Sequence, residues 1–569
     1  MRAKTTSLII AACCLGAASA TAGMWMFDGT DKLTHTYTDV EWALKVSAEG
    51  KSLTVTGVHR KPSSPAELPL TDVVTGDYTI TAIGDGAFKR CDALSGVMTI
   101  PAGVTHIGNG AFFRCEGLTG ITIPSSVTRI GNMAFGACYG LTAMTIPGSV
   151  THIEDNAFAY CTGLTEIMIP ASVTEFGDSA FNGCTNLARI AVSEENTDYK
   201  SVDGILFNKN GNVLIRHPPA RQAKAYAIPD GVTYIGGGAF DHCASLTEVT
   251  IPDTVDAIGN GAFYYCTGLT EITIPARVDY IERGMFKGCA HLSKITVAAA
   301  NTAYRSIDGV LFDSDVTELF RYPPARQAKT YAIPDGVTNI VYDAFANCVG
   351  LTEVTIPGSV IDIQTSAFVG CTGLTKVTIP DSVTDIGSGH VFYNCTGLTE
   401  VTIGSGITNI CFSTFGYCTS LKTVTIPDSV THIEGYAFTG CTGLTGVTIP
   451  NSVTRIDRNA FEDCARLPNV TIPASVTSLG ESVFLRCAAL TGVTFNGTCP
   501  EGAENLYGDK SFYEGVAEPT LSVTSYIQRE HAASWAARLD SGSLEDGTAI
   551  WQERPIKVLR DAFGNGQAR

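Results

Sequence analysis

A pattern of apolar and polar positions with a period of about 23 residues runs along most of the chain. In residues 371–392, CTGLTKVTIPDSVTDIGSGHVF, the apolar Val377 and Ile379 alternate with polar residues, a proline follows, and a second short segment ends at Ile386. Strict alternation is typical of a strand with one buried face. Proline ends such a strand because it donates no hydrogen bond to the ladder. Each repeat therefore predicts two short strands separated by a turn.

A cysteine marks the register of every repeat. Phenylalanine stands three residues before each of these cysteines and leucine three residues after it. The fifteen cysteines of this column are Cys91, Cys115, Cys138, Cys161, Cys184, Cys243, Cys266, Cys289, Cys348, Cys371, Cys395, Cys418, Cys441, Cys464 and Cys487. One repeat then reads A-F-x-x-C-x-x-L-x-x-V-x-I-P-x-S-V-T-x-I-G, in which the A-F-x-x-C segment predicts a short helical turn.

A single repeat of this length cannot fold alone, because its few apolar side chains do not offset the entropy lost when its backbone is ordered. Repeats that stack at about 4.8 Å share their buried faces, so we expect a β-rich solenoid. Stacking at that spacing brings equivalent cysteines close together with parallel side chains, which is a poor geometry for a disulfide. We expect buried free thiols.

Two insertions interrupt the period. The steps from Cys184 to Cys243 and from Cys289 to Cys348 each span 59 residues, and the two inserted stretches match each other at an offset of 105. In each stretch two apolar runs flank a turn-forming segment, which predicts a β-hairpin. We place the insertions at about residues 193–228 and 298–333.

Both hairpins end in basic and aromatic residues. These residues are Arg216, Arg221, Arg321, Tyr322 and Arg326. Two interpretations remain open: the segments contact a ligand, or prolines brace them and their charges are solvated.

The two ends of the chain depart from the repeat. Residues 1–22 combine Arg2 and Lys4 with an apolar run and small residues at Ala18 and Ala20, which is typical of a cleaved secretory signal. The lipobox-like stretch that ends at Cys13 offers lipidation as an alternative.

Flanking segments without the repeat are expected to cover the open edges of the solenoid. Alternation in residues 23–77 predicts an N-terminal β cap with a hairpin. Residues 496–569 predict a C-terminal cap with a helix near 528–539 and a last strand near 555–559. Cys499, outside the column, is expected to be exposed or to reach Cys487.

Composition and motifs narrow the possible functions. The net charge of −18 argues against nucleic acid, whose binding needs clustered Lys and Arg. No segment after the signal has the roughly 20 consecutive apolar residues of a membrane helix. We find no catalytic constellation and no cofactor motif. Asp362 and Asp385, neighbours in one column, are two carboxylates without further ligands, so no metal site is predicted.

Residues 78–495 closely resemble the BspA-type leucine-rich repeat, since fifteen copies of the motif keep their fixed positions together. The resemblance implies a leucine-rich repeat solenoid with a parallel β-sheet on its concave face, short helical turns opposite, two β-hairpin insertions and terminal caps. Such proteins are typically bacterial secreted or cell-surface molecules, and several are adhesins.

The residue before the buried Val of each strand should face outward. This position carries the candidate binding residues Glu166, Glu248, Glu271, Lys294, Glu353, Lys376 and Glu400. The sequence thus predicts a non-enzymatic extracellular protein that binds an extracellular protein or a cell-surface glycan through its concave sheet. The alternative is a passive structural component of the cell surface.

Overall fold

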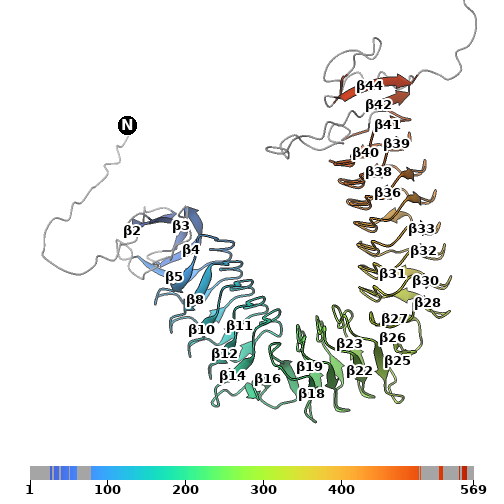
Figure 1. Cartoon of the computed structure of the whole chain (residues 1–569). Helices are drawn as coiled ribbons and strands as arrows, with labels where there is room; N and C mark the ends of the chain where they lie inside the picture. Colours follow the sequence, from blue (N-terminus) through green and yellow to red (C-terminus); the bar gives the residue numbers. More distant parts are fainter. Residues whose placement is uncertain are drawn as a thin grey trace, which may run out of the picture. The chain divides into compact units, whose positions relative to one another are not determined.

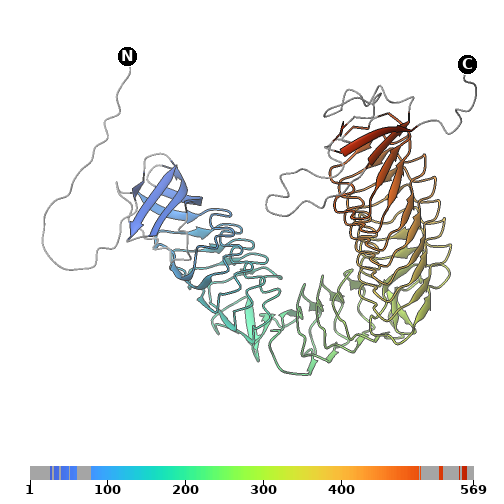
Figure 2. The same cartoon turned by 45° about the horizontal axis from the view of Figure 1, so that its top comes forward.

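The computed structural model describes the repeat region almost completely. It covers residues 26–27, 31–37, 40–49, 52–60, 78–498, 500–501, 524–528, 550–551 and 554–559. The predicted signal peptide, Cys13, Cys499 and residues 529–539 of the predicted helix lie outside these ranges. The chain forms two compact units, one of residues 1–163 and 175–180 and the other of residues 164–174 and 181–569. Within each unit, coils of chain stack on one another (Figures 1 and 2).

Each coil contributes two short strands, as the alternating pattern predicts. The L-x-x-V-x-I segments form β6 (Gly96–Thr99), β8 (Leu118–Thr122), β10 (Ala143–Thr145), β12 (Glu166–Ile169), β14 (Arg189–Val192), β18 (Ala225–Ala227), β20 (Glu248–Thr250), β22 (Glu271–Ile274), β24 (Lys294–Val297), β28 (Thr330–Ala332), β30 (Glu353–Thr355), β32 (Lys376–Thr378), β33 (Glu400–Thr402), β35 (Thr423–Thr425), β37 (Gly446–Thr448), β39 (Asn469–Ile472) and β41 (Gly492–Phe495).

The V-T-x-I segments and their equivalents form the second series. It comprises β5 (Thr79–Ile83), β7 (His106–Ile107), β9 (Arg129–Ile130), β11 (His152–Ile153), β13 (Glu175–Phe176), β19 (Tyr234–Ile235), β21 (Ala257–Ile258), β23 (Tyr280–Ile281), β29 (Asn339–Ile340), β31 (Asp362–Ile363), β34 (Asn409–Ile410), β36 (His432–Ile433), β38 (Arg455–Ile456) and β40 (Ser478–Leu479). In both series the strands of successive coils pair in parallel, for example β32 with β33 and β36 with β38.

Recurrent serine and threonine side chains tie each coil to the one before it. Ser382 Oγ donates a hydrogen bond to the carbonyl of Val360 at 2.7 Å. Thr375 Oγ1 donates to the carbonyl of Thr352 at 3.1 Å. These carbonyls belong to residues that shortly precede a strand, and that of Thr352 also accepts the amide of Thr375 at 3.0 Å. The repeated P-x-S-V and L-T positions of the motif are therefore used for contacts between coils.

The segment expected to be a short helical turn is a series of β-turns, and the described residues contain no helix. The amide of Cys371 donates to the carbonyl of Phe368 at 3.2 Å, which closes one turn, whereas the amide of Phe368 donates to Val391 in the next coil. Gly370, directly before Cys371, has a φ of 69°. A left-handed residue cannot continue a right-handed helix, so the expectation of a helix was wrong here.

The core is a set of buried columns that follow the repeat. In the larger unit the rings of successive column phenylalanines stack, with centroids 4.7 Å apart for Phe345 and Phe368 and 5.1 Å apart for Phe368 and Phe392. All fifteen column cysteines are buried thiols rather than halves of disulfides, which confirms the expectation for this column. Cys411, outside the column, is half-buried and also free.

Each insertion holds the predicted hairpin and one additional strand. The first comprises β15 (Tyr199–Val202), β16 (Ile205–Asn208) and β17 (Val213–Arg216), and the second β25 (Tyr304–Ile307), β26 (Val310–Asp313) and β27 (Glu318–Arg321). Neighbouring strands within each set are antiparallel, and the last strand of each set then pairs in parallel with β19 or β29. The last strand of each insertion therefore continues the second strand series in the same direction.

The ends of the repeat region carry further strands. They are β1 (Met26–Phe27), β2 (Lys32–Tyr37), β3 (Val40–Glu49) and β4 (Ser52–Arg60) before it, and β42 (Thr524–Gln528), β43 (Ile550–Trp551) and β44 (Arg554–Leu559) after it. The hairpin of β3 and β4 lies where the N-terminal cap is expected, because β4 pairs in parallel with β5. The expected last strand is β44, and Gln528 ends a strand.

Candidate functional site

The candidate binding residues form a row across the first strand series, which we call the strand column. All seven of them, Glu166, Glu248, Glu271, Lys294, Glu353, Lys376 and Glu400, are exposed. In β22 the buried Ile272 and Ile274 alternate with the exposed Glu271 and Thr273. Alternation along the pleat turns these side chains away from the core, so their prediction as outward-facing residues is confirmed.

The structure brings the strand column together in three groups. Glu166 lies opposite Arg189 in the pairing of β12 with β14. Glu271 lies opposite Lys294, and a hydrogen bond from the amide of Thr270 to the carbonyl of Thr247 places Glu248 on the adjacent coil.

The third group contains an ion pair. Glu353 lies opposite Lys376, which lies opposite Glu400. Lys376 Nζ and Glu400 Oε1 are 2.8 Å apart, and the hydrogen bond and charge of Glu400 raise the pKa of Lys376. Both side chains are exposed, so the pair contributes little to stability. It does neutralise part of the acidic charge in this group.

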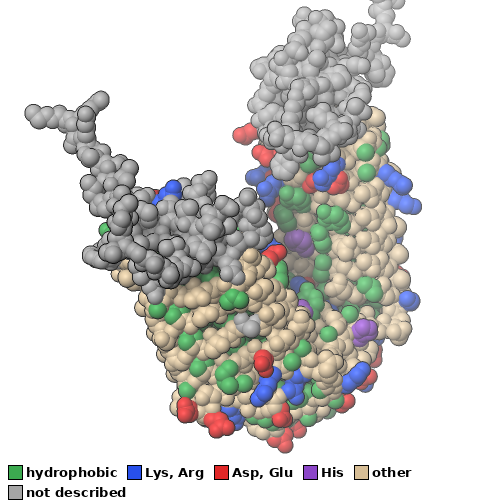
Figure 3. All heavy atoms as spheres, turned by 60° about the vertical axis from the view of Figure 1, so that its left-hand side comes forward, with side chains coloured by type: hydrophobic (Ala, Val, Ile, Leu, Met, Phe, Trp, Pro, Cys, Tyr) green, Lys and Arg blue, Asp and Glu red, His purple; other side chains and the backbone are tan. Residues whose placement is uncertain are grey.

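Two neutral residues of the strand column were not predicted. Ala225 in β18 lies opposite Glu248, and Thr330 in β28 lies opposite Glu353. They belong to the coils that the insertions add, and the Y-x-I-P segment that follows each is the sequence signal that could have placed them. On the face shown in Figure 3, acidic and basic side chains are interspersed in small groups rather than gathered into one field.

The alternative site at the hairpins is not a basic surface. Arg216, Arg321 and Tyr322 are buried, with 1%, 5% and 1% of their surface exposed. Arg221 and Arg326 are half-buried, and their guanidinium groups donate to the carbonyls of Asp203 and Asp308. The hypothesis that these residues contact a ligand is therefore wrong for Arg216, Arg321 and Tyr322, and so is the view that the charges of Arg216 and Arg321 are solvated.

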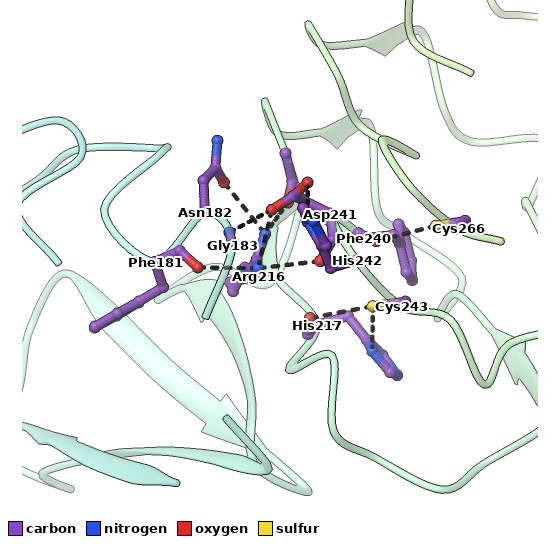
Figure 4. A network of polar contacts seen from close by, with 11 residues as sticks. Phe181, Asn182, Gly183, Arg216, His217, Phe240, Asp241, His242, Cys243 and Cys266 are labelled. Carbon is purple, nitrogen blue, oxygen red and sulfur yellow. Dashed lines mark hydrogen bonds and ion pairs between the residues drawn. The ribbon is translucent and has the colours of Figure 1, made fainter. Parts of the chain in front are cut away.

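Arg216 is held in a network of backbone carbonyls and one carboxylate (Figure 4). Its guanidinium donates to the carbonyls of Phe181 and Asp241 at 3.0 and 3.1 Å, and also to the carbonyl of Gly238. Asp241 Oδ2 lies 3.6 Å from Arg216 Nη2 and accepts the amide of Gly183 at 2.6 Å. Buried charges are tolerated when they are paired and hydrogen-bonded in this way.

The ionisation of the neighbouring groups fits this network. Burial opposes the charge of Asp241, but the hydrogen bond from His242 and the charge of Arg216 outweigh it, so the pKa of Asp241 lies below its usual value. His217 is buried beside Arg221 and Arg216, and burial together with these charges lowers its pKa to about 3. His217 is therefore neutral at physiological pH, and the network is structural.

The second insertion also places a buried arginine next to backbone carbonyls, but the neighbouring acidic residue has a different partner. Arg321 donates to the carbonyl of Ala346 at 3.1 Å and to that of Asp343. The buried Asp343 carboxylate is 3.1 Å from Lys287 Nζ. In both insertions an arginine from the end of the hairpin satisfies carbonyl groups where the regular stack is interrupted.

The described residues show no cluster of side chains that could bind a metal ion. Asp362 and Asp385 form an isolated parallel bridge. No group of three or more His, Cys, Asp and Glu residues within the described ranges is arranged to hold a metal ion. In the same ranges no helix has the length and apolar character needed to cross a membrane.

Comparisons with known proteins agree with the geometry of the repeats. A family model described as "BspA type Leucine rich repeat region (6 copies)" matches residues 77–210, 221–319, 317–441 and 388–514. No curated protein matches the sequence.

Three solved structures are among those similar to this chain. A leucine-rich cell surface protein of Faecalibacterium prausnitzii is 28% identical with a TM-score of 0.35, over 82% of this chain and 95% of that chain. A leucine-rich repeat protein of Eubacterium ventriosum is 23% identical with a TM-score of 0.36, over 73% and 95%. The pneumococcal vaccine antigen PcpA is 17% identical with a TM-score of 0.30, over 93% and 98%.

Proposed function

Because the chain belongs to the BspA-type leucine-rich repeat family, we propose that it is a non-enzymatic extracellular protein that binds a partner through its strand column. The observation that carries the proposal is the exposed row of charged residues on paired parallel strands. Rigid strands hold such side chains at fixed spacing, and extended surfaces of this kind are what solenoids use for binding.

The partner that fits best is an extracellular protein with a basic surface. Glu248 and Glu271 lie on adjacent coils, and neither forms an ion pair with another described residue. The whole chain carries a charge of −18. Complementary charge raises the association rate and fixes the register of a complex. Salt screens exposed charges, so the affinity should fall as the salt concentration rises.

Charge reversal tests the proposal. The mature chain is screened against a panel of extracellular proteins, and each binder is measured again with Glu248, Glu271, Glu353 and Glu400 changed to Lys. We expect the fold to be retained, because the positions are exposed, and the affinity to drop at least about tenfold, which is about 1.4 kcal/mol.

The matched control reverses four exposed acids that lie in turns, namely Asp230, Asp253, Asp335 and Asp428. This variant has the same net charge and should bind like the unmodified chain. Equal losses in both variants would show that only net charge matters. A panel without any binder would favour a passive structural component instead.

A further inference from the structure

A row of aromatic rings lies on the turn side of the coils, away from the strand column. His390 contacts Phe412 with ring centroids 5.4 Å apart, and Phe412 contacts Tyr436 at 5.3 Å. Tyr393 lies 5.3 Å from His390 and 5.4 Å from Tyr417. We call these five residues the aromatic track. The contacts between these rings run across three successive coils.

The aromatic track is separate from the buried core. The column phenylalanines Phe392, Phe415 and Phe438 already fill the interior of the same coils and are fully buried. Tyr417 is 45% exposed, and the other four rings are half-buried. The track therefore adds apolar surface to the outside of coils whose core is complete.

Three of the rings stand at turn positions whose left-handed conformation recurs along the repeat. His390, Tyr417 and Tyr436 have φ values of 58°, 58° and 59°. Equivalent positions hold glycine or asparagine in some coils and bulky residues in others, such as Arg114 and Tyr160. The backbone conformation therefore belongs to the repeat, and the contacts between rings on successive coils are what distinguish the aromatic track.

Glycines make room for two of the rings. A Cβ atom added to Gly440 would lie 2.7 Å from Cδ1 of Tyr417, and one added to Gly416 would lie 3.0 Å from Cδ2 of Tyr393. Each tyrosine ring thus lies close against the backbone of the following coil. Tyr417 also contacts Tyr393 and still exposes 45% of its surface.

One end of the aromatic track carries a positive charge. The guanidinium of Arg458 lies 5.7 Å from the ring centroid of Tyr436, in the coil after it. Arg458 is exposed and forms no ion pair with any acid in the described part of the chain. The nearby Asp457 already pairs with His432 and Arg455, and Glu434 accepts the amide of Phe412.

We propose that the aromatic track binds a glycan that ends in a carboxylated sugar. A pyranose ring has an apolar C–H face that packs on an aromatic face, and hydroxyl groups at its edge that suit tyrosine hydroxyls and water. The carboxylate of the terminal sugar pairs with Arg458, whose planar guanidinium donates two parallel hydrogen bonds to it. Rings on successive coils, with centroids 5.3 and 5.4 Å apart, suit a chain of sugars.

The charges around the aromatic track argue against two other classes of ligand, basic peptides and long polyanions. A basic peptide would be repelled by Arg458 at the end of the track. A long polyanion would be repelled by the chain as a whole, since its net charge is −18. One carboxylate at the end of an otherwise neutral glycan matches one unpaired guanidinium.

The test compares 3′-sialyllactose with lactose as probes in calorimetric titrations of the mature protein. We expect sialyllactose to bind at least about tenfold more tightly than lactose. Arg458→Gln should reduce the affinity for sialyllactose to that for lactose. Arg466→Gln, at another exposed arginine in the same coil region, is the matched control and should change neither affinity.

A second pair of variants separates binding from folding. Tyr417→Asn and Tyr436→Asn introduce a residue that occurs with positive φ at the equivalent positions Asn347 and Asn459. Both should therefore keep or raise the Tm while they abolish sialyllactose binding. The control is Tyr265→Asn, because Tyr265 has a φ of 52° and 43% exposure but lies outside the track.

Several outcomes would overturn the proposal. They are the absence of sialyllactose binding, equal affinity for both probes, and a lowered Tm with unchanged binding in the tyrosine variants. Tetragalacturonate that binds regardless of Arg458 would indicate a nonspecific response to anions. Reversal of the acids in the strand column should leave sialyllactose binding unchanged, so this test is independent of the proposed protein partner.

Discussion

The thiol of a column cysteine is a hydrogen-bond donor as well as a small apolar group. Cys138 Sγ donates to the carbonyl of Phe112 at 3.1 Å, and Cys371 Sγ donates to that of Phe345 at the same distance. The same geometry recurs along the stack. These thiols add a second hydrogen bond to a carbonyl of the preceding coil that already accepts a backbone amide, a contact that alanine could not make.

These thiols should be unreactive in the folded protein. Burial raises the pKa of Cys138, Cys243 and Cys441 to about 12, and the thiolate is the reactive form. We expect a chromogenic disulfide reagent at pH 8 to modify none of the column cysteines in the native state and all of them in guanidinium chloride. Rapid native labelling at a column position, identified by peptide mapping, would contradict the buried column.

The raised pKa values also predict how stability depends on pH. A thiol in the unfolded chain ionises near pH 8.5, whereas the same thiol in the fold stays protonated until about pH 12. The stabilisation is therefore complete below about pH 8.5 and is lost as the pH rises through this window. The Tm should fall over that range, and Cys441→Ala should reduce the slope.

At the scale of elements, the insertions depend on buried arginines. The last strand of each insertion, β17 or β27, ends in an arginine that donates to carbonyls of neighbouring coils. For Arg216 one of these carbonyls belongs to Phe181, which precedes it by 35 residues. Arg216 thus connects the strands of the first insertion to the regular coil before it and to the one after it.

Removal of this arginine should loosen the first insertion. Arg216→Met removes one charge partner of the buried Asp241, which keeps His242 and the amide of Gly183, and also removes the donor to three buried carbonyls. We expect these losses together to cost about 3–5 kcal/mol. Arg277→Met is the matched control, because Arg277 pairs with Asp256 at 3.0 Å on the surface and its loss should cost at most about 1 kcal/mol. Chemical denaturation measures both, and hydrogen exchange should show the loss in β15 to β17. Equal costs would show that the network does not hold the insertion.

At the scale of the whole molecule, the regular coils of a unit contact mainly their neighbours, and side chains reach past the adjacent coil at the insertions. Pairing, side-chain hydrogen bonds and ring stacking all join one coil to the next. The stability of such a stack is close to a sum over coils and the interfaces between them. Removal of one complete coil should therefore leave the remaining columns in register.

Deletions within the first unit test this additivity. Deletion of residues 116–138 removes one repeat of 23 residues and joins Cys115 to Tyr139. The product should keep its circular dichroism spectrum and a cooperative melt, with the Tm lowered by a few degrees. Deletion of residues 116–127 removes only part of a repeat and should lower the Tm much further, because it places polar side chains in the buried columns. Similar melts for both deletions would contradict the register argument.

The sequence by itself determined the coil, the two strands, the buried columns and the outward position of Glu271 and Lys376. These features follow from alternation and from a fixed period, which act within a coil and between adjacent coils. The hairpins followed from the same local signals. The additional strands β15 and β25 and the conformation of the A-F-x-x-C turn were not predicted. In that turn the left-handed residue before each cysteine gives β-turns instead of a helical turn.

Tertiary structure alone decided which charges are buried and which rings meet. Arg216 and Arg321 each stand two residues before a pair of prolines. Their burial depends on carbonyl groups supplied by other coils. The aromatic track likewise joins Tyr393, Phe412 and Tyr436, which lie on different coils and share no local motif. A periodic sequence fixes what recurs in every coil. Contacts between residues that depart from the repeat arise only when stacking brings those residues together.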